Sequence, residues 1–238
     1  MKDVLGTALK AYYFDKNTKD KLFTNSSISE QDELPLNYLF RSFKEMPVLE
    51  QKALALAKGK ILDVGCGAGN HALYLQDQKK NVKGIDISKG AIEVAKDRGL
   101  KHTEINNIYD FKSEEKYDTI LVLMNGTGIC GKLDKLADFL THLSSFLNPS
   151  GQILIDSSDV IYMFEDEKGE HWIDASQNYY GEVEFSMKYK QLETEKFDWL
   201  YVDYNTLQRC AIYHQLNCEL IIEGNHYDYL ARITKAKS

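Results

Sequence analysis

ILDVGCGAGN, residues 61–70, joins an apolar strand to a glycine-rich turn and the beginning of a helix. Glycine occupies alternate positions of the turn, at Gly65, Gly67 and Gly69. Without a side chain, these residues can adopt backbone angles closed to others, and a ligand can come close to the main chain. The N–H groups at the start of the following helix would face that ligand. The pattern predicts a ligand-binding turn between a strand and a helix of an α/β protein.

Two features separate this turn from the GxGxxG turn of nicotinamide and flavin proteins, which occupies the same place in the fold. Asn70 stands where that pattern has its third glycine. Asp63 lies two residues before the first glycine, where its carboxylate would repel a pyrophosphate and attract a cationic amino group. We therefore expect a ligand that is positively charged near Asp63. A nicotinamide-dependent oxidoreductase is a disfavoured alternative.

A second carboxylate ends the next predicted strand. Asp86, in KGIDIS, lies 21 residues after Gly65 and can accept hydrogen bonds from the hydroxyls of a ribose. S-adenosylmethionine has both a ribose and a cationic amino-acid tail. With DVGCGAGN and Asp86 in register, the chain resembles the class I S-adenosylmethionine-dependent methyltransferases over about residues 59–158, and over 204–235 in its order of elements.

The resemblance implies a role for each matching position. The glycine turn would cradle the methionine part of the cofactor, Asp86 would hold the ribose, and Ile87 would lie against the adenine ring. Where the family usually has an acidic residue that accepts from the adenine amino group, this chain has Asn107, whose amide oxygen can accept the same bond. The expected cofactor-binding residues are Asp63, Gly65, Cys66, Gly67, Gly69, Asp86, Ile87, Asn107, Ile108 and Met124.

Short apolar strands alternate with amphipathic helices between residues 60 and 156, which is typical of a mostly parallel sheet covered on both faces. Strands are expected at 60–64, 81–85, 102–106, 118–124 and 152–156, and helices from about Asn70, Ser88 and Lys132. Asn205 can cap a later helix, and CELIIEG and YDYLARIT read as two strands joined by a turn. We expect a doubly wound α/β fold with a seven-stranded sheet whose last strand is antiparallel.

Two segments are not explained by the resemblance. Residues 1–58 read as helical, since LNYLFRSFKEM has apolar residues at helical spacing, and they would form a cap or lid. Residues 159–203 contain GEVEFSMKYK and FDWLYV, which favour a β-hairpin inserted into a Rossmann-like domain of residues 59–238. Both segments are rich in aromatic residues and could enclose a partly apolar cavity. Packing against each other, or across a homodimer, is an equal alternative.

The methyl acceptor would bind beyond the carboxyl ends of the strands. One predicted strand is followed there by Asn125-Gly126-Thr127, without the two prolines that often follow this Asn in amino-directed methyltransferases, and another by a cluster of Asp and Ser. The candidate substrate residues are Asn125, Asp156, Asp159, Tyr12 and Tyr13, and all but Asn125 are candidate bases together with His171. No base is assigned, because methyl transfer needs one only where the nucleophile must lose a proton.

The charge of the chain limits the kinds of molecule that it is expected to bind. The chain has 29 basic and 36 acidic residues, and residues 159–203 hold twelve acidic residues against four lysines. A polyanion would be repelled there, so a small or medium-sized acceptor is expected and nucleic acid is disfavoured.

The longest apolar run, Ile120–Met124, is far too short to span a membrane, and no apolar signal core follows Met1. Four cysteines without a CxxC pair indicate thiols in a reducing cytoplasm and no zinc site.

A non-catalytic protein that binds S-adenosylmethionine would need the same cofactor residues and is the alternative to an enzyme.

Overall fold

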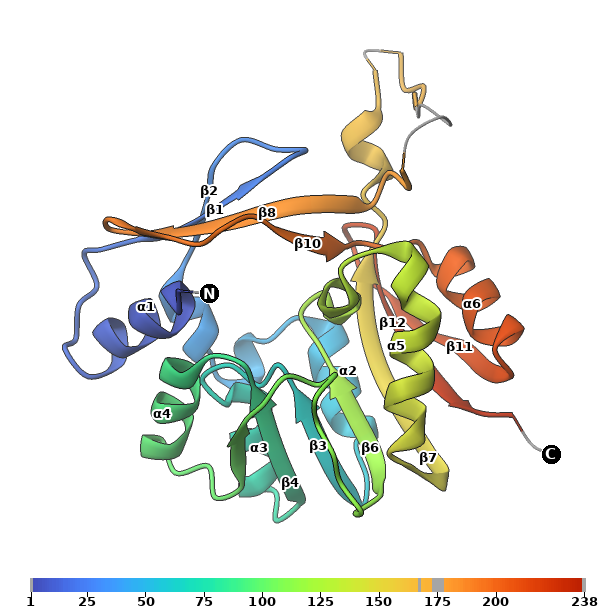
Figure 1. Ribbon diagram of the computed structural model, residues 1–238, viewed down its shortest axis with the longest axis horizontal. Coiled ribbons are helices and arrows are strands. Elements are labelled where there is room, and N and C mark those ends of the chain that lie inside the picture. Colours follow the sequence, from blue (N-terminus) through green and yellow to red (C-terminus); the bar gives the residue numbers. More distant parts are fainter. Residues whose placement is uncertain (1, 167, 173–177, 237–238) are drawn as a thin grey trace.

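The computed structural model describes residues 2–166, 168–172 and 178–236. Its centre is a seven-stranded sheet in the order β11-β12-β7-β6-β3-β4-β5 (Figure 1). The strands are β3 (Lys60–Val64), β4 (Asn81–Asp86), β5 (Thr103–Ile105), β6 (Tyr117–Val122), β7 (Leu147–Ser158), β11 (Leu216–Glu223) and β12 (Asp228–Lys235). Strands β3 to β7 are parallel to one another, whereas β12 is antiparallel to both β7 and β11. The predicted sheet with an antiparallel last strand is confirmed.

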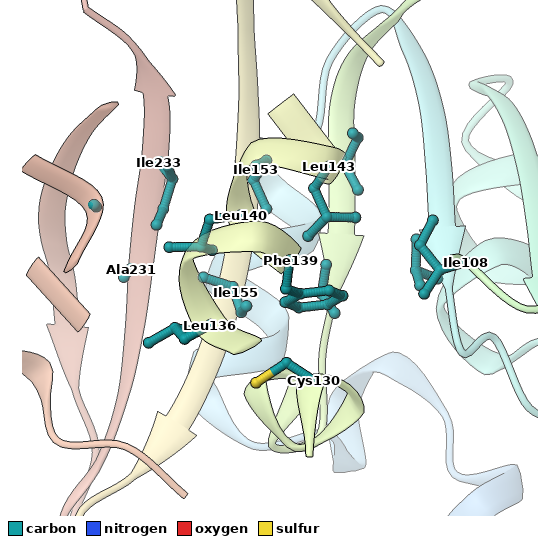
Figure 2. Close-up of a cluster of buried hydrophobic side chains, with 14 of the residues drawn as sticks. Ile108, Cys130, Leu136, Phe139, Leu140, Leu143, Ile153, Ile155, Ala231 and Ile233 are labelled. Atoms are coloured by element: carbon teal, nitrogen blue, oxygen red, sulfur yellow. The ribbon is translucent and has the colours of Figure 1, made fainter. Parts of the chain in front are cut away.

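Helices cover both faces of this sheet. The helices are α2 (Val48–Leu56), α3 (Asn70–Asp77), α4 (Lys89–Asp97), α5 (Leu133–Ser145) and α6 (Tyr204–Tyr213). On one face, Leu136 and Leu140 of α5 pack against Ile153 and Ile155 of β7, in a core that α6 extends (Figure 2). On the other face, α2 and α3 bury a second core that includes Leu154 of β7. Because both faces of the sheet are covered, the sequences of its central strands are continuous apolar runs.

A second, antiparallel sheet lies across one end of the first sheet (Figure 1). Its strands are β1 (Leu22–Ser26), β2 (Asp32–Leu34), β8 (Glu182–Tyr189), β9 (Leu192–Glu193) and β10 (Phe197–Leu200). The order is β10-β8-β1-β2, with β9 also paired to β8. The predicted hairpin of residues 159–203 therefore forms β8 and β10, and it completes its sheet with strands from the N-terminal segment.

The expectation that residues 1–58 are helical is wrong between the two helices at its ends. α1 (Val4–Tyr13) is followed by β1 and β2, and LNYLFRSFKEM forms two short 3-10 helices, η1 (Leu36–Phe40) and η2 (Phe43–Glu45). β1 is a strand because it pairs with β8, for example Leu22 with Tyr189. The sequence around Leu22 does not indicate a partner so distant in the chain. η2 is separate from η1, since Ser42 and Glu45 form a capping box that begins a new helix.

Other details refine the prediction at single residues. Asp203, not Asn205, caps α6, and its side chain accepts from the N–H of Thr206. α1 is a packed element, since Val4, Ala8 and Leu9 are at most 1% exposed.

Candidate active site

The turn between β3 and α3 contains three glycines in the left-handed region. The φ angle is +72° at Gly65, +54° at Gly67 and +84° at Gly69. A Cβ atom on Gly67 would meet nothing within 4 Å, so the turn opens on free space at this residue. A Cβ atom on Gly69 would lie 3.2 Å from the Cβ of Ala95, so this glycine lets the turn lie close to α4. The open space at Gly67 would admit a ligand close to the main chain, and the missing side chain at Gly69 admits α4.

Asp63 is the second-last residue of β3 and has an unpaired carboxylate oxygen among the described residues. The residue is 2% exposed, and its Oδ2 atom has no hydrogen-bond partner among the residues that the structure describes. Burial raises the pKa of this carboxyl to about 6, although the charge of His71 opposes the shift. A buried carboxylate oxygen without a partner costs free energy. A cation within hydrogen-bond distance would stabilise it.

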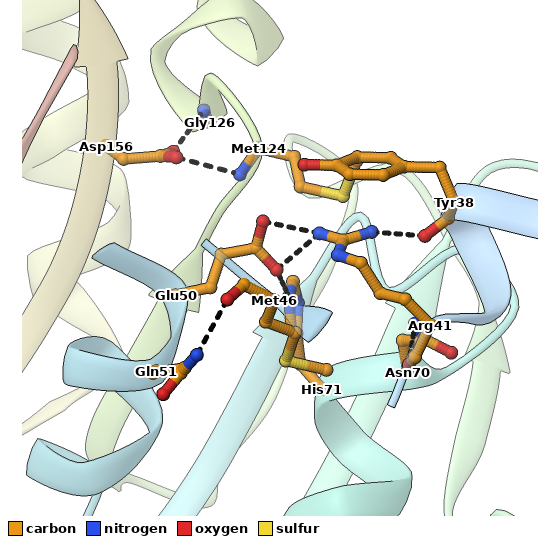
Figure 3. A network of polar contacts seen from close by, with 10 residues as sticks. All are labelled: Tyr38, Arg41, Met46, Glu50, Gln51, Asn70, His71, Met124, Gly126 and Asp156. Atoms are coloured by element: carbon orange, nitrogen blue, oxygen red, sulfur yellow. Dashed lines mark hydrogen bonds and ion pairs between the residues drawn. The ribbon is translucent and has the colours of Figure 1, made fainter. Parts of the chain in front are cut away.

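Figure 3 shows a buried cluster of ionisable groups, Arg41, Glu50 and His71, and the charge of Asp63 acts on His71. Glu50 of α2 accepts from the guanidinium of Arg41 with both oxygens, and from Nε2 of His71 at 2.6 Å. The ring centroid of Tyr38 is 3.8 Å from the central guanidinium carbon. Burial opposes the charge on Glu50 and on His71. Their mutual hydrogen bond and the neighbouring charges nevertheless leave the pKa of Glu50 lowered and that of His71 raised.

Three buried polar atoms around this cluster have no partner within the described parts of the chain: Nε of Arg41, Oδ2 of Asp63 and Oδ1 of Asn70. The Nδ2 atom of Asn70 donates to the backbone oxygen of Arg41 at 2.8 Å, which ties the two residues together. One free donor and two free acceptors, next to an open glycine turn, suit a group with both a carboxylate and an ammonium. The amino-acid tail of S-adenosylmethionine is such a group, and the residues present fit it.

Asp86 ends β4 and faces the same turn. Its Oδ2 accepts from the N–H of Gly67 at 2.8 Å and its Oδ1 from the N–H of Ser88 at 2.7 Å. Burial raises the pKa of Asp86 despite these donors. Each carboxylate oxygen has a second lone pair, so both can still accept a hydroxyl hydrogen.

The positions expected around an adenine ring differ in exposure. Ile87 is 67% exposed, a large value for an apolar side chain next to a buried carboxylate. The Oδ1 atom of Asn107 accepts from the N–H of Tyr109 at 3.1 Å and keeps one lone pair. Ile108 is only 3% exposed and packs in the core beneath α5, so its side chain does not face this surface.

The segment after β6 forms a left-handed turn. Met124 and Asn125 have φ angles of +69° and +56°. Asp156 of β7 holds this turn, because its carboxylate accepts from the N–H groups of Met124 (3.1 Å) and Gly126 (3.0 Å). The hydroxyl of Ser158 donates to Oδ1 of Asn125 at 2.9 Å. Sequence analysis placed Asn125 and Asp156 on the same side of the sheet, and the structure brings them together.

Comparison with known proteins identifies the family. A family model described as a methyltransferase domain matches residues 56–205, which is more than half of the chain. The chain belongs to the methyltransferase family. A crystal structure of an S-adenosylmethionine-dependent methyltransferase from Bacteroides fragilis, in complex with S-adenosylhomocysteine, is 46% identical with a TM-score of 0.92. The match covers 99% of this chain and 96% of that chain.

Two curated relatives agree with this assignment. An uncharacterized methyltransferase of Staphylococcus carnosus is 25% identical over 197 residues, which are 83% of this chain and 87% of the relative. A ubiquinone biosynthesis O-methyltransferase of Rickettsia felis is 30% identical over 107 residues, 43% of this chain and 42% of the relative. The protein is an S-adenosylmethionine-dependent methyltransferase with the class I Rossmann-like fold, as the glycine turn and Asp86 predicted. The oxidoreductase and non-catalytic alternatives are set aside.

The remaining candidate residues of the methyltransferase have other surroundings. Tyr12 and Tyr13 stack on Phe40, with ring centroids 4.9 Å and 6.0 Å away, between α1 and the 3-10 helix η1. His171 is exposed and forms an isolated bridge with Glu165. None of these three is brought to the Met124–Asn125 turn by a contact that the structure records. Asp159 follows β7 directly, and its Oδ1 accepts from the hydroxyl of Tyr180 at 2.8 Å.

Four residues of the candidate site were not predicted as site residues from the sequence: Arg41, Glu50 and His71 of the cluster, and Asn70 beside it. Asn70 and His71 directly follow the glycine turn, and an amide and an imidazole at the start of a helix were a signal that could have been used. Arg41 and Glu50 carry no motif. They reach the turn only through the fold of the N-terminal segment.

Within the described residues, no helix is long and apolar enough to cross a membrane, and no three His, Cys, Asp or Glu side chains could hold a metal ion together.

Proposed function

We propose that this methyltransferase transfers the methyl group of S-adenosylmethionine to a small or medium-sized molecule held between the carboxyl ends of β6 and β7 and the antiparallel sheet above them. The observation that carries the proposal is a set of three buried atoms without a partner among the described residues, two of them on Asp63 and Asn70, which flank the glycine turn, and one on Arg41, which Asn70 contacts. The second sheet supports the location of the acceptor, since it lies against the element that follows β6. There, Thr127 donates to the backbone oxygen of Leu200 in β10 at 3.0 Å.

The cofactor tail would be held by complementary charges. Oδ2 of Asp63 and Oδ1 of Asn70 accept from its ammonium, and Nε of Arg41 donates to its carboxylate. Glu50 and His71 keep the guanidinium in place. Charge-assisted hydrogen bonds of this kind are among the stronger ones in proteins.

The nucleoside would lie along the edge formed by β4 and β5. Both oxygens of Asp86 accept from the ribose hydroxyls, Ile87 packs against the adenine ring, and Asn107 accepts from the adenine amino group. Ile108 would contact the adenine ring only through its backbone, because its side chain is buried in the core. The glycines and Cys66 form the floor of the site, and Met124 closes it on the side of β6.

When bound, S-adenosylmethionine supplies a methyl carbon already activated by the sulfonium, which an acceptor atom attacks in line. The chain's own residues align the two partners and exclude water, and such orientation can account for roughly 7–11 kcal/mol of a barrier. Asp156 is proposed to shape the turn after β6, because each of its carboxylate oxygens accepts from a backbone N–H group of that turn. Asp159, which directly follows β7, stays a candidate base, and no base is assigned.

The charge of the molecule supports the choice of acceptor. Residues 159–203, which supply β8 and β10 of the second sheet, have a net charge of −8. Repulsion would oppose a nucleic acid there, so a small molecule is proposed. A cytoplasmic location and a homodimer stay expectations from sequence.

The test is calorimetry with two ligands that differ in the tail. S-adenosylhomocysteine has the amino-acid tail, and 5′-methylthioadenosine has the same nucleoside without it. An Arg41→Lys variant keeps a cation next to Glu50 but removes Nε. We expect it to lose affinity for S-adenosylhomocysteine and to bind 5′-methylthioadenosine like wild type. Equal losses for both ligands, or no loss for either, would refute the role of Arg41 in holding the tail.

A further inference from the structure

The turn formed by Met124 and Asn125 places two successive residues in the left-handed region, which asparagine adopts fairly often and methionine rarely. Both have positive φ angles, and neither is glycine. Two successive side-chain-bearing residues in the left-handed region cost free energy and persist only when the surrounding structure holds them. Such strain is often found at functional sites. Here it lies directly after β6, on the side of the sheet that carries the proposed methyl-transfer site.

Asp156 is the group that holds the turn. One carboxylate oxygen accepts from Met124, the first left-handed residue, and the other from Gly126, which follows the second. The side chain therefore spans the turn. A carboxylate has no hydrogen to donate, so it can face two N–H groups at once, whereas an amide would point its own NH₂ at one of them.

The hydrogen bonds of Asp156 among the described residues tie it to the turn. Burial raises the pKa of Asp156 to about 6, and the charge of Glu50 in α2 adds to this shift. Glu50 is already paired with Arg41 and His71.

We propose that Asp156 is a positioning residue for methyl transfer: its carboxylate imposes the left-handed turn that sets Met124 against the cofactor and presents Asn125 to the acceptor. Ser158, two residues further along β7, fixes the amide of Asn125 from the same strand. β7 thus shapes the end of β6 through two side chains. This inference rests on the proposed location of the methyl group, which is why its test begins with the free protein.

The experiment uses the methyl groups of methionine, labelled with ¹³C, as NMR reporters. The chain has five methionines, and Met124 is the one in the turn. In an Asp156→Asn variant, the peak of Met124 should move by more than its linewidth while those of Met163 and Met187 stay in place. After addition of S-adenosylhomocysteine, it should not reach its wild-type bound position.

The matched control is Asp118→Asn. Asp118 belongs to β6 and, like Asp156 of β7, has a carboxylate that accepts a backbone N–H, that of Lys60 at 2.8 Å, but it lies at the end of β6 far from Met124. This variant should leave the Met124 peak unchanged with and without ligand. If Asp156→Asn also leaves that peak at its wild-type positions, Asp156 does not impose the turn and the proposal is wrong.

A second variant keeps the proposal testable if the Asp156→Asn variant does not fold. If Asp156→Asn alone unfolds, Asn125→Gly is added, because glycine adopts the left-handed conformation without strain. The double variant should fold and return the Met124 peak toward its wild-type position. A double variant that stays unfolded would show that the carboxylate serves something other than the turn. If wild type itself gives no response to S-adenosylhomocysteine, the proposed function fails, and the comparison of free proteins still decides the role of Asp156.

Discussion

The carboxylates of Asp3 and Asp86 share Ser88 as a hydrogen-bond donor. The N–H of Ser88 donates to Asp86 and its hydroxyl to Asp3, each at 2.7 Å. Asp3 also accepts from the N–H groups of Gly6 (2.9 Å) and Gly90 (2.8 Å), so one side chain caps both α1 and α4. The N-terminal helix is thereby connected to the carboxylate proposed to hold the ribose.

Replacing Asp3 by Ala should affect both stability and ligand binding. Loss of a helix cap lowers the free energy of unfolding by about 0.5–2 kcal/mol. The affinity for S-adenosylhomocysteine should fall severalfold, because Ser88 loses a partner that orients it toward Asp86. Urea unfolding and calorimetry measure the two effects. Asp203→Ala, which removes the cap of α6, should lower stability alone. An Asp3 variant with wild-type affinity would show that the connection does not matter for binding.

Replacing Asp86 by Ala should weaken every ligand that contains the ribose. Losing hydrogen bonds to a charged group typically costs about 1.5–3 kcal/mol, or roughly ten- to a hundredfold in Kd. S-adenosylhomocysteine and 5′-methylthioadenosine should lose affinity alike in calorimetry, in contrast to variants of the tail site. An unchanged Kd would mean that the ribose is held elsewhere.

Replacing Asp63 by Asn should separate stability from binding. The pKa of this carboxyl is raised from an ordinary 3.8 to about 6, so the folded protein keeps a proton that the unfolded chain has released in that interval. Its contribution to stability is complete below about pH 4 and is lost as the pH rises through 6, a change on the order of 3 kcal/mol. The free variant should therefore gain stability relative to wild type between pH 5 and pH 7.5.

The same variant should bind S-adenosylhomocysteine weakly at pH 7.5, since the ammonium loses its charged partner. The affinity of wild type should decrease below pH 6, where Asp63 becomes protonated. Urea unfolding at the two pH values checks the first effect and calorimetry the second. A stability difference that does not change with pH would contradict the raised pKa.

The central sheet and the cofactor edge were predictable because their signals are local. The glycines of the turn and Asp63 lie within seven residues of one another, and the requirements for a sharp turn and for a charge operate at that distance. Asp86 ends the next strand, so the parallel order of the strands brings it to the same turn. The same reasoning placed Asn125 and Asp156 together.

The rest depends on contacts between distant parts of the chain. β1 was missed because Leu22 becomes part of a strand only by pairing with Tyr189. Arg41 and Glu50 come from the same N-terminal segment, and nothing near them in the sequence marks a site. The left-handed conformation of Asn125 is common for this residue type, but that of Met124 is imposed by Asp156 and could not be predicted.

The most direct test of the cofactor site compares two glycines. Gly67 and Gly99 both have positive φ angles, +54° and +100°, and a Cβ atom on either would meet nothing within 4 Å. Alanine therefore strains the backbone in both variants without a clash, but only at Gly67 does it enter the space proposed for the cofactor. The measurement is thermal melting with S-adenosylhomocysteine at about a hundred times the wild-type Kd, where a ligand stabilises a protein by about 2.7 kcal/mol. Wild type and Gly99→Ala should both show the full rise in melting temperature, and Gly67→Ala should show none. A Gly67→Ala variant that shifts as far as Gly99→Ala would contradict the placement of the cofactor in this turn.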